Sequence, residues 1–380
     1  MRTLRNGPLL DLRIVEFAGI GPAPFAAMLL ADMGADVVRV ARPDAPHLDG
    51  RDLVERGRRV VHVDLKSRDG VATVLKLLDQ ADALLEGFRP GVMERLGVGP
   101  DPVLRRNPRL VYGRMTGWGQ TGPLATAAGH DINYIALTGA LHAIGEAGGA
   151  PVPPLNLLGD FGGGALYLVV GVLAALLEAR HSGRGQVVDA AIIDGTASLL
   201  TFVHAAMARD TWRDQRGSNL LDGGAPFYAT YRCADGAYVA VGALEPQFHA
   251  RLLERLGLPA EAFAARDDPA TWPRLKELLR AAFAARTQQQ CRDLLEGTDA
   301  CFAPVLSLRE AAAHPQLAAR GVFAALDGVP CPAPAPRFSR TPSALRPVQG
   351  ALHDAAAIAR EWAAGSRAAP AVAEGAGGDA

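Results

Sequence analysis

The sequence predicts an α/β protein with a mostly parallel sheet and a second, smaller domain. Short apolar runs alternate with amphipathic helical segments over residues 12–117, which is typical of βαβ units. After about residue 215 the pattern changes to a hairpin followed by amphipathic helices. A chain of 380 residues is long enough for two domains of this kind.

The first half supplies the elements of the parallel sheet. Five apolar runs are predicted as strands, at residues 12–19, 36–42, 60–65, 82–87 and 110–117. Helices are expected at 24–34, where Gly34 ends the periodic pattern, and at 68–81. A helix-rich stretch follows, with helices expected at 131–144, 161–181 and 193–208.

The second half supplies the smaller domain, which we expect at 223–310. Residues 226–244 predict a β-hairpin around the turn ADGA, and helices are expected at 245–257 and 272–286. The Pro-rich segment 329–342 is predicted to return to the first domain as an extended strap. Residues 366–380 are rich in Ala and Gly and lack apolar periodicity, so we expect a disordered tail.

Composition excludes several classes of function. Hydrophobic content of 49%, charged content of 21% and a net charge of -1 are those of a globular protein without a nucleic-acid footprint. The four cysteines show no CxxC spacing, so we expect no metal and a reducing cytoplasm. No signal peptide is expected, and the apolar run at 165–179 is short for a membrane span.

The first strand-to-helix turn departs from a dinucleotide fingerprint. Gly19 and Gly21 fit G-x-G, but Pro24 stands where the third glycine belongs. The second strand ends in Arg42 rather than in an acidic residue. An arginine there suits a phosphorylated ribose, such as that of coenzyme A, better than NAD. Solvated charges at the end of the strand are an equally good interpretation of the residues alone.

More cations follow the ends of other predicted strands. Lys66 follows the third strand, and Arg89 and Arg95 follow the fourth. Ligands of open parallel sheets bind at the carboxyl ends of the strands, so these side chains and Arg42 predict an anion site there. Each of them alone is typical of an ordinary surface charge.

A carboxylate and three glycines interrupt an apolar run in NLLGDFGGGALYLVVG. Asp160 and Gly162 to Gly164 stand at the predicted start of a helix. An N-cap and close helix packing explain them without any chemistry, and the residues alone favour that interpretation. The alternative is an acid/base group beside unbonded backbone amides that stabilise an oxyanion, with glycines admitting the substrate. His130, just before another helix, is ambiguous alone.

Several long segments resemble the family III (CaiB/BaiF) coenzyme A transferases. The resemblance runs from about residue 9 to 342 and rests on LRIVEFAGIGPAPFAAMLLADMGADVVRVARPD, VVHVDLKS, LLEGFRPGVMERLG, MTGWGQTGP, GHDINYIALTGALHAIG, PPLNLLGDFGGGALYLVVGVLAAL and SGRGQVVDAAIIDG. It implies a Rossmann-like large domain built from residues 1–215 and 325–365. It also implies an interlocked homodimer with each active site between subunits.

The resemblance also implies roles for individual residues. His130 and Asp160 match the catalytic pair, and Glu245 of the small domain matches a glutamate that supports the histidine. The positions that match coenzyme A contacts are Arg42, Val63, Asp64, Leu65, Lys66, Gly87, Phe88, Arg89, Arg95, Gly129, Asp131, Ile132, Asn133 and Tyr134.

Within that family the chain is most similar to members that racemise 2-methylacyl-CoA thioesters through an enolate. We therefore expect His130 and Asp160 to act on opposite faces of one carbon, with no cofactor beyond the coenzyme A of the substrate and no metal. The alternative is a transferase in which Asp160 is the nucleophile. A second alternative is a non-catalytic protein that binds acyl-CoA. Such a protein would keep the cations of the anion site but would not exchange the α-proton.

Overall fold

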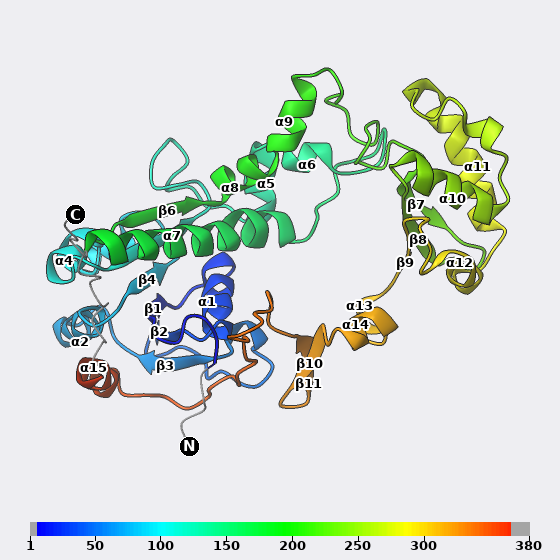
Figure 1. The fold of residues 1–380 in the computed structure, drawn as a ribbon. Coiled ribbons are helices and arrows are strands. Elements are labelled where there is room, and N and C mark those ends of the chain that lie inside the picture. The colour runs from blue at the N-terminus through cyan, green and yellow to red at the C-terminus, as the bar shows by residue number, and fades with distance from the viewer. Residues whose placement is uncertain (1–5, 366–380) are drawn as a thin grey trace, which may run out of the picture. The chain divides into compact units, whose positions relative to one another are not determined.

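The computed structural model describes residues 6–365, and the predicted tail at 366–380 lies outside them. The chain forms two compact units (Figure 1). Among the described residues, unit 1 comprises 6–114, 168–188 and 334–365, and unit 2 comprises Met115–Tyr167 and Asp189–Ala333. Each unit is therefore assembled from segments that lie far apart in the sequence.

A six-stranded sheet organises unit 1, and its strand order is that of a Rossmann-like fold. In spatial order the strands are β3 (Arg58–His62), β2 (Asp36–Ala41), β1 (Arg13–Phe17), β4 (Ala83–Glu86), β5 (Val111–Thr116) and β6 (Val187–Ala191). The pairings of β1 with β2 and β4, of β2 with β3 and of β4 with β5 are all parallel. The five predicted strands are confirmed. The last strand, β6, was missed because its VVDAA run is short and exposed at its start.

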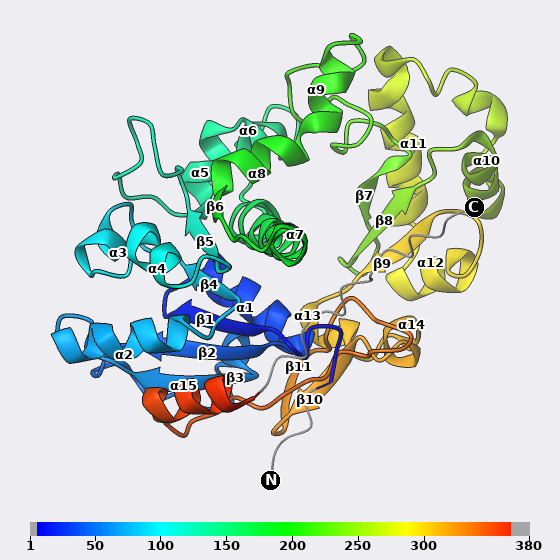
Figure 2. The same cartoon turned by 60° about the vertical axis from the view of Figure 1, so that its left-hand side comes forward.

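Helices cover both faces of this sheet (Figure 2). They are α1 (Pro22–Asp32), α2 (Arg68–Leu78), α3 (Val92–Arg95), α4 (Pro100–Arg106), α7 (Tyr167–Ser182) and α15 (Ala355–Ala364), with a 3₁₀ turn η1 (Leu53–Glu55). One core cluster joins the strands to α2, α3, α4 and α15. On the other face α7 packs closely on β5, since a Cβ at Gly113 would meet Val172 at 3.0 Å and Leu168 at 3.1 Å.

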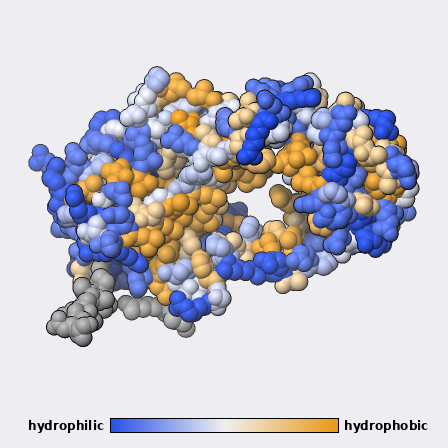
Figure 3. Space-filling model, turned by 45° about the horizontal axis from the view of Figure 1, so that its top comes forward, coloured by the Kyte–Doolittle hydropathy of each residue, from blue (hydrophilic) through white to orange (hydrophobic). Residues whose placement is uncertain are grey.

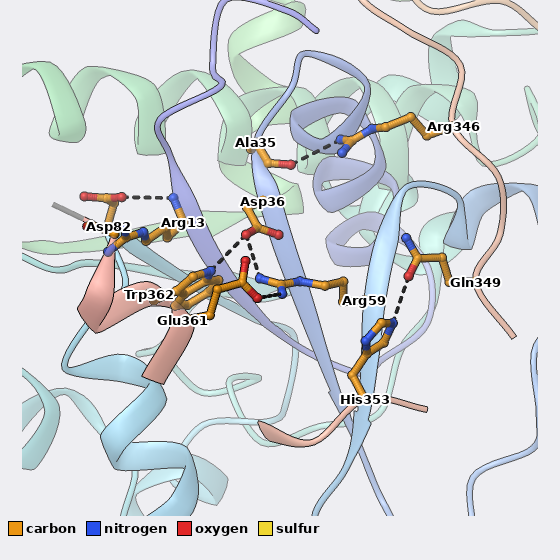
Figure 4. Close-up of polar contacts among 11 residues, drawn as sticks. Arg13, Ala35, Asp36, Arg59, Asp82, Arg346, Gln349, His353, Glu361 and Trp362 are labelled. Carbon is orange, nitrogen blue, oxygen red and sulfur yellow. Dashed lines mark hydrogen bonds and ion pairs between the residues drawn. The ribbon is translucent and has the colours of Figure 1, made fainter. Parts of the chain in front are cut away.

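The C-terminal segment returns to unit 1 and is bound to the first three strands (Figure 4). Asp36 accepts hydrogen bonds from Trp362 at 2.8 Å and from Arg59 at 2.6 Å. Arg59 also pairs with Glu361 at 2.8 Å, and Arg346 donates to the carbonyl of Ala35 at 3.1 Å. The two ends of the chain thus build one unit.

Unit 2 contains a helical part and an α+β part. The helical part holds α5 (Asp131–Leu137), α6 (Ala140–Ala143), the π-helix η2 (Leu157–Leu166), α8 (Ile192–Leu199) and α9 (Thr201–Met207). The α+β part holds the antiparallel strands β7 (Tyr228–Arg232), β8 (Tyr238–Gly242) and β9 (Phe302–Val305), with α10 (Pro246–Leu256), η3 (Ala260–Phe263), η4 (Pro269–Thr271), α11 (Trp272–Ala284) and α12 (Gln288–Leu295). Then follow α13 (Leu308–Ala311), α14 (Pro315–Ala319) and the hairpin β10 (Phe323–Leu326) to β11 (Val329–Pro332). The hairpin expected at 226–244 is confirmed as β7 and β8.

The two compact units divide the chain differently from the predicted boundaries. Residues 115–167 and 189–215, which we assigned to the large domain, group with unit 2. Helix η2 continues directly into α7, so one helical run extends over Leu157–Ser182. By length and composition this run, of 26 residues, is sufficient to cross a membrane, and the prediction that the apolar run is too short was wrong on length. Its buried face, however, includes Leu168, Val172 and Leu176, as in a core helix.

Candidate active site

The first half of the site is the turn that leads into α5. His130 is the N-cap residue of α5 and is exposed, and its backbone amide donates to the side chain of Asn133 at 3.0 Å. Tyr134 donates its hydroxyl to the carbonyl of Gly129 at 2.5 Å, and its ring packs edge-on against Trp118 at 4.7 Å. Asn133 and Tyr134 therefore hold the loop around His130 in place.

Glycines make room for that tyrosine. A Cβ at Gly117 would lie 2.0 Å from the Tyr134 ring, and one at Gly129 would lie 2.8 Å from it. Both glycines therefore serve packing. Beside them a depression of about 420 Å³ is lined by Trp118, Ala128, Asn133, Ala136 and Leu137. It is mostly apolar, and it lies on the same helix that His130 caps.

The second half of the site is η2, which carries Asp160. We expected a helix that starts at Asp160, and this was wrong: the helix begins at Leu157 and has π geometry. In a π-helix each amide bonds to the carbonyl five residues earlier, as Phe161 does with Asn156 at 3.2 Å. Asp160 therefore lies within the first turn rather than at the N-cap. Its side chain is half-buried.

The structure brings the two halves together through Asp131. The carboxylate of Asp131 accepts a hydrogen bond from the backbone amide of Asp160 at 2.6 Å. That amide is consequently unavailable to an oxyanion, contrary to the expectation that it would be unbonded. His130 lies close enough to Asp160 for the charge of its imidazolium to lower the pKa of the carboxyl group.

The net effect of the surroundings is to raise the pKa of Asp160 above its ordinary value. Burial is the main cause, and the negative charge of Asp131 adds to it. A hydrogen bond from Asn156 and the positive charge of His130 lower the pKa of Asp160, but by less than burial and Asp131 raise it. This carboxyl group therefore holds a proton more readily than an exposed aspartate does.

Gly163 of η2 serves helix packing. A Cβ at Gly163 would lie 2.5 Å from the hydroxyl and 2.7 Å from the amide of Thr196 on α8, and one at Gly195 would lie 1.9 Å from the carbonyl of Gly163. The two helices thus cross with their backbones in contact. For Gly163 the interpretation as close packing, rather than as space for substrate, is confirmed.

Glu245 lies in unit 2 but is not joined to the histidine within this chain. It is the exposed N-cap residue of α10, next to the strands of the α+β part. Among the described residues 6–365, neither an ion pair nor a hydrogen bond links Glu245 to His130. The supporting role implied by the resemblance therefore has no basis within a single chain.

The predicted cations of unit 1 are placed at the carboxyl ends of its strands, and two of them share a depression. Lys66 follows β3, and Arg95 ends α3. Both line a depression of about 510 Å³, together with Leu65, Ser67, Arg68, Val71, Ala72, Leu75 and Leu96. Within residues 6–365 no acidic side chain pairs with Lys66, Arg68 or Arg95, so the depression is a cationic one. Arg68 is a cation of this depression that sequence reasoning missed.

The remaining predicted contact residues have several different environments. Arg42 is exposed and pairs weakly with Asp44 at 3.5 Å, and Arg89 is exposed. Val63 is buried, so only its backbone can reach a ligand. Asp64 shapes the turn before α2 by accepting the Lys66 amide at 2.9 Å.

A buried carboxylate holds the loop that contains Gly87, Phe88 and Arg89. Glu86 accepts from the amide of Phe88 at 2.8 Å and pairs with Arg114 at 2.8 Å. Gly87 is exposed, whereas Phe88 is half-buried with its ring against Phe17. The loop is therefore held from beneath, and its outer face stays free for a ligand. Ile132 of α5 is exposed as well.

The arrangement in unit 2 can perform proton transfer. An imidazole and a carboxyl group with a raised pKa lie near each other at the starts of two packed helices. Over residues 6–365 no cluster of three or more His, Cys, Asp or Glu side chains could hold a metal ion. An imidazole near a carboxyl group can act as a general acid and a general base.

A Rossmann-like sheet with a cationic depression at its strand ends is typical of proteins that bind phosphorylated, nucleotide-like ligands. Residues 9–352 match CoA-transferase family III, and the chain belongs to this family. The family assignment agrees with the resemblance carried by the sequence motifs.

Two relatives and one solved structure are similar to this chain over most of its length. The chain is 47% identical over 337 residues to mouse alpha-methylacyl-CoA racemase, covering 88% of this chain and 87% of that protein. It is 44% identical over 336 residues to the human protein of the same name, with the same coverage. A crystal structure of a CaiB/BaiF family protein from Brucella suis is similar with a TM-score of 0.79 at 25% identity, covering 94% of this chain and 99% of that one.

Proposed function

We propose that this protein is a racemase that interconverts the (2R)- and (2S)-epimers of 2-methylacyl-CoA thioesters. The observation that carries the proposal is a half-buried Asp160 of raised pKa, within reach of the charge of His130, on a helix packed against α5. Two relatives that are named alpha-methylacyl-CoA racemase and cover most of the chain support the same activity.

The reaction requires two acid/base groups on opposite faces of one carbon. Neutral His130 removes the α-proton, and the electron pair of the C–H bond moves onto the thioester oxygen to form an enolate. Protonated Asp160 then returns a proton to the opposite face as the enolate collapses. The products are the other epimer, an imidazolium and a carboxylate, which is the starting state for the reverse direction. The substrate supplies its own coenzyme A, so the reaction as proposed needs no other cofactor and no metal.

Substrate binding is assigned to unit 1. Lys66, Arg68 and Arg95 surround a depression at the strand ends of a Rossmann-like sheet, where phosphate groups bind in folds of this kind. We assign the phosphates of coenzyme A to this region and to Arg42. The loop of Gly87 to Arg89, held by Glu86, is assigned to the same nucleotide.

We propose that the protein acts as a homodimer. The helical run through α7 has apolar side chains on its outer face, where Leu166, Val170 and Leu177 are 48%, 66% and 68% exposed. Figure 3 shows apolar side chains gathered in several patches on one face of the molecule. A patch of this kind is best covered by a second copy of the chain, because most oligomers of soluble proteins are closed and symmetric. In such a dimer Glu245 of the partner subunit is the one to support His130.

One experiment separates racemisation from acyl-CoA transfer. The protein is incubated in heavy water with a single epimer of a 2-methylacyl-CoA and with no carboxylic acid acceptor. We expect deuterium at the α-carbon and mixing of the epimers. A family III transferase with Asp160 as nucleophile would instead move coenzyme A only when an acceptor is added, and would leave the α-proton in place.

Variants of the histidine sharpen the same test. His130→Ala removes the base that only racemisation requires, so we expect loss of both exchange and mixing. If His130→Ala kept full transferase turnover with an added acceptor, the racemase proposal would be wrong. A protein that binds the thioester without any exchange would instead be a non-catalytic binder.

A further inference from the structure

Asp131 is the contact that joins the two helices of the candidate active site. It is the first residue of α5, directly after His130, and its side chain is half-buried. Its carboxylate reaches across to η2 and accepts the amide of Asp160 at 2.6 Å. The resemblance implies a substrate contact for this residue, whereas the structure shows its carboxylate engaged with the protein backbone.

The fit around this contact is tight. A Cβ at Gly159 would lie 2.3 Å from the carboxylate oxygen of Asp131 and 2.8 Å from Ile135. Any side chain at position 159 would therefore displace the carboxylate from the amide. Gly159 is buried, so the first turn of η2 is held directly against the first turn of α5.

We propose that Asp131 is a positioning residue for the reaction: its carboxylate fixes the first turn of η2 against α5 and places a negative charge beside the acid that delivers the proton. This inference rests on the racemase activity proposed above. It deepens that activity by naming the group that sets where Asp160 stands and when it carries its proton.

The electrostatic part of this role follows from the groups that face Asp160. From α5 these are Asp131 and His130, and from its own segment Asn156. The other helix packed on η2 is α8, whose Asp194 is exposed and does not contribute to the shift. After burial, the charge of Asp131 is the main cause that raises the pKa of Asp160.

The charge has a consequence for the pH profile. The active pair carries one proton in total, so activity falls at low pH when both groups are protonated. A raised pKa of Asp160 moves this acid limb of kcat/KM toward higher pH. Removing the charge of Asp131 lowers the pKa of Asp160, and the acid limb should then move toward lower pH.

Two variants separate the charge from the geometry. Asp131→Asn keeps an oxygen that accepts the Asp160 amide and removes the charge, so we expect the acid limb to move to lower pH, with a smaller loss of kcat than in Asp131→Ala. Asp131→Ala removes both, and we expect kcat to fall by about 10- to 100-fold through misplacement of Asp160. Epimer mixing and α-deuterium incorporation are measured over a range of pH.

Asp194→Asn is the matched control, because it removes a charge from the other helix packed on η2 without touching Asp160. Its acid limb should match that of the unmodified protein. Thermal unfolding shows whether each variant is folded, and Asp131→Asn keeps the test open if Asp131→Ala does not fold.

An unmoved acid limb in Asp131→Asn, or an unchanged kcat in folded Asp131→Ala, would overturn the inference. Failure of the racemase proposal itself looks different, since the unmodified protein would then show no α-exchange at any pH.

Discussion

Glu16 in the sheet of unit 1 and Asp160 at the helix crossing of unit 2 are both carboxyl groups whose pKa is raised by burial, but their surroundings differ. Glu16 is fully buried on β1 and contacts Arg58 at 2.6 Å, and burial raises its pKa to about 7 although Arg58 opposes the change. Asp160 is half-buried and lies near an exposed histidine.

A raised pKa therefore does not by itself identify an active site. Glu16 cannot be reached by a substrate, and its partner is an arginine that stays protonated. Asp160 is partly exposed, and its neighbour is the imidazole of His130, the side-chain type most often used as a general acid or base. Accessibility and a titratable partner distinguish a catalytic carboxyl group from a structural one.

The largest expected effect is a loss of activity when the carboxyl group of Asp160 is removed. Asp160→Asn removes the acid while keeping the shape of the side chain, and we expect kcat to fall by about 10²- to 10⁴-fold. Epimer mixing measures the loss, and thermal unfolding should be nearly unchanged. If Asp160→Asn retained ordinary activity, Asp160 would belong with Glu16 as a structural residue.

The next largest effect is a loss of stability when the buried carboxyl group of Glu16 is removed. Glu16→Ala leaves the fully buried Arg58 without its main partner, and we expect the free energy of unfolding to fall by about 3 kcal/mol or more. Urea denaturation measures this change. At temperatures where the variant is folded, kcat should stay near that of the unmodified protein, in contrast to Asp160→Asn.

The same residue should make stability depend on pH. The pKa of Glu16 is about 7 in the folded protein, against an ordinary value of 4.5 in an unfolded chain, so the folded state binds more protons between these values. Its contribution to stability is then complete below about pH 4.5 and is lost as the pH rises through about 7. Glu16→Gln should remove this part of the slope in urea denaturation at a series of pH values; an unchanged slope would contradict it.

A smaller effect concerns the helix crossing that holds Asp160. Gly163→Ala places a Cβ 2.5 Å from the Thr196 hydroxyl, and we expect a loss of about 1–3 kcal/mol in stability together with a reduced kcat. Gly162→Ala is the control, because its Cβ meets nothing closer than 3.1 Å. Equal losses in the two variants would contradict this assignment to the crossing, because Ala by itself favours a helix more than Gly does.

The smallest effect concerns the exposed cations of unit 1. Lys66→Ala should raise KM for the acyl-CoA by about three- to fivefold while leaving kcat unchanged, because an exposed charge contributes little to binding. Lys76→Ala, on the exposed face of the same α2 helix, should leave KM unchanged. A lower kcat in Lys66→Ala would mean that Lys66 acts on the reacting centre.

Local patterns determined a large part of this fold. Alternation of apolar strands with helices predicted β1 to β5, and the turn ADGA predicted the hairpin of β7 and β8. The long motifs also carried the family and the positions of His130 and Asp160. Such features depend on neighbouring residues or on short spacings, which a single sequence displays directly.

Features that depend on distant residues were decided only by the tertiary structure. Asp131 accepts the Asp160 amide and Glu16 pairs with Arg58, although the sequence of neither segment indicates the other. The π geometry of η2 is likewise not indicated by its own residues. Each is set by how closely two backbones approach and by which charges burial brings together. These are properties of packing, and they raise the pKa of Asp160 above the ordinary value of an aspartate.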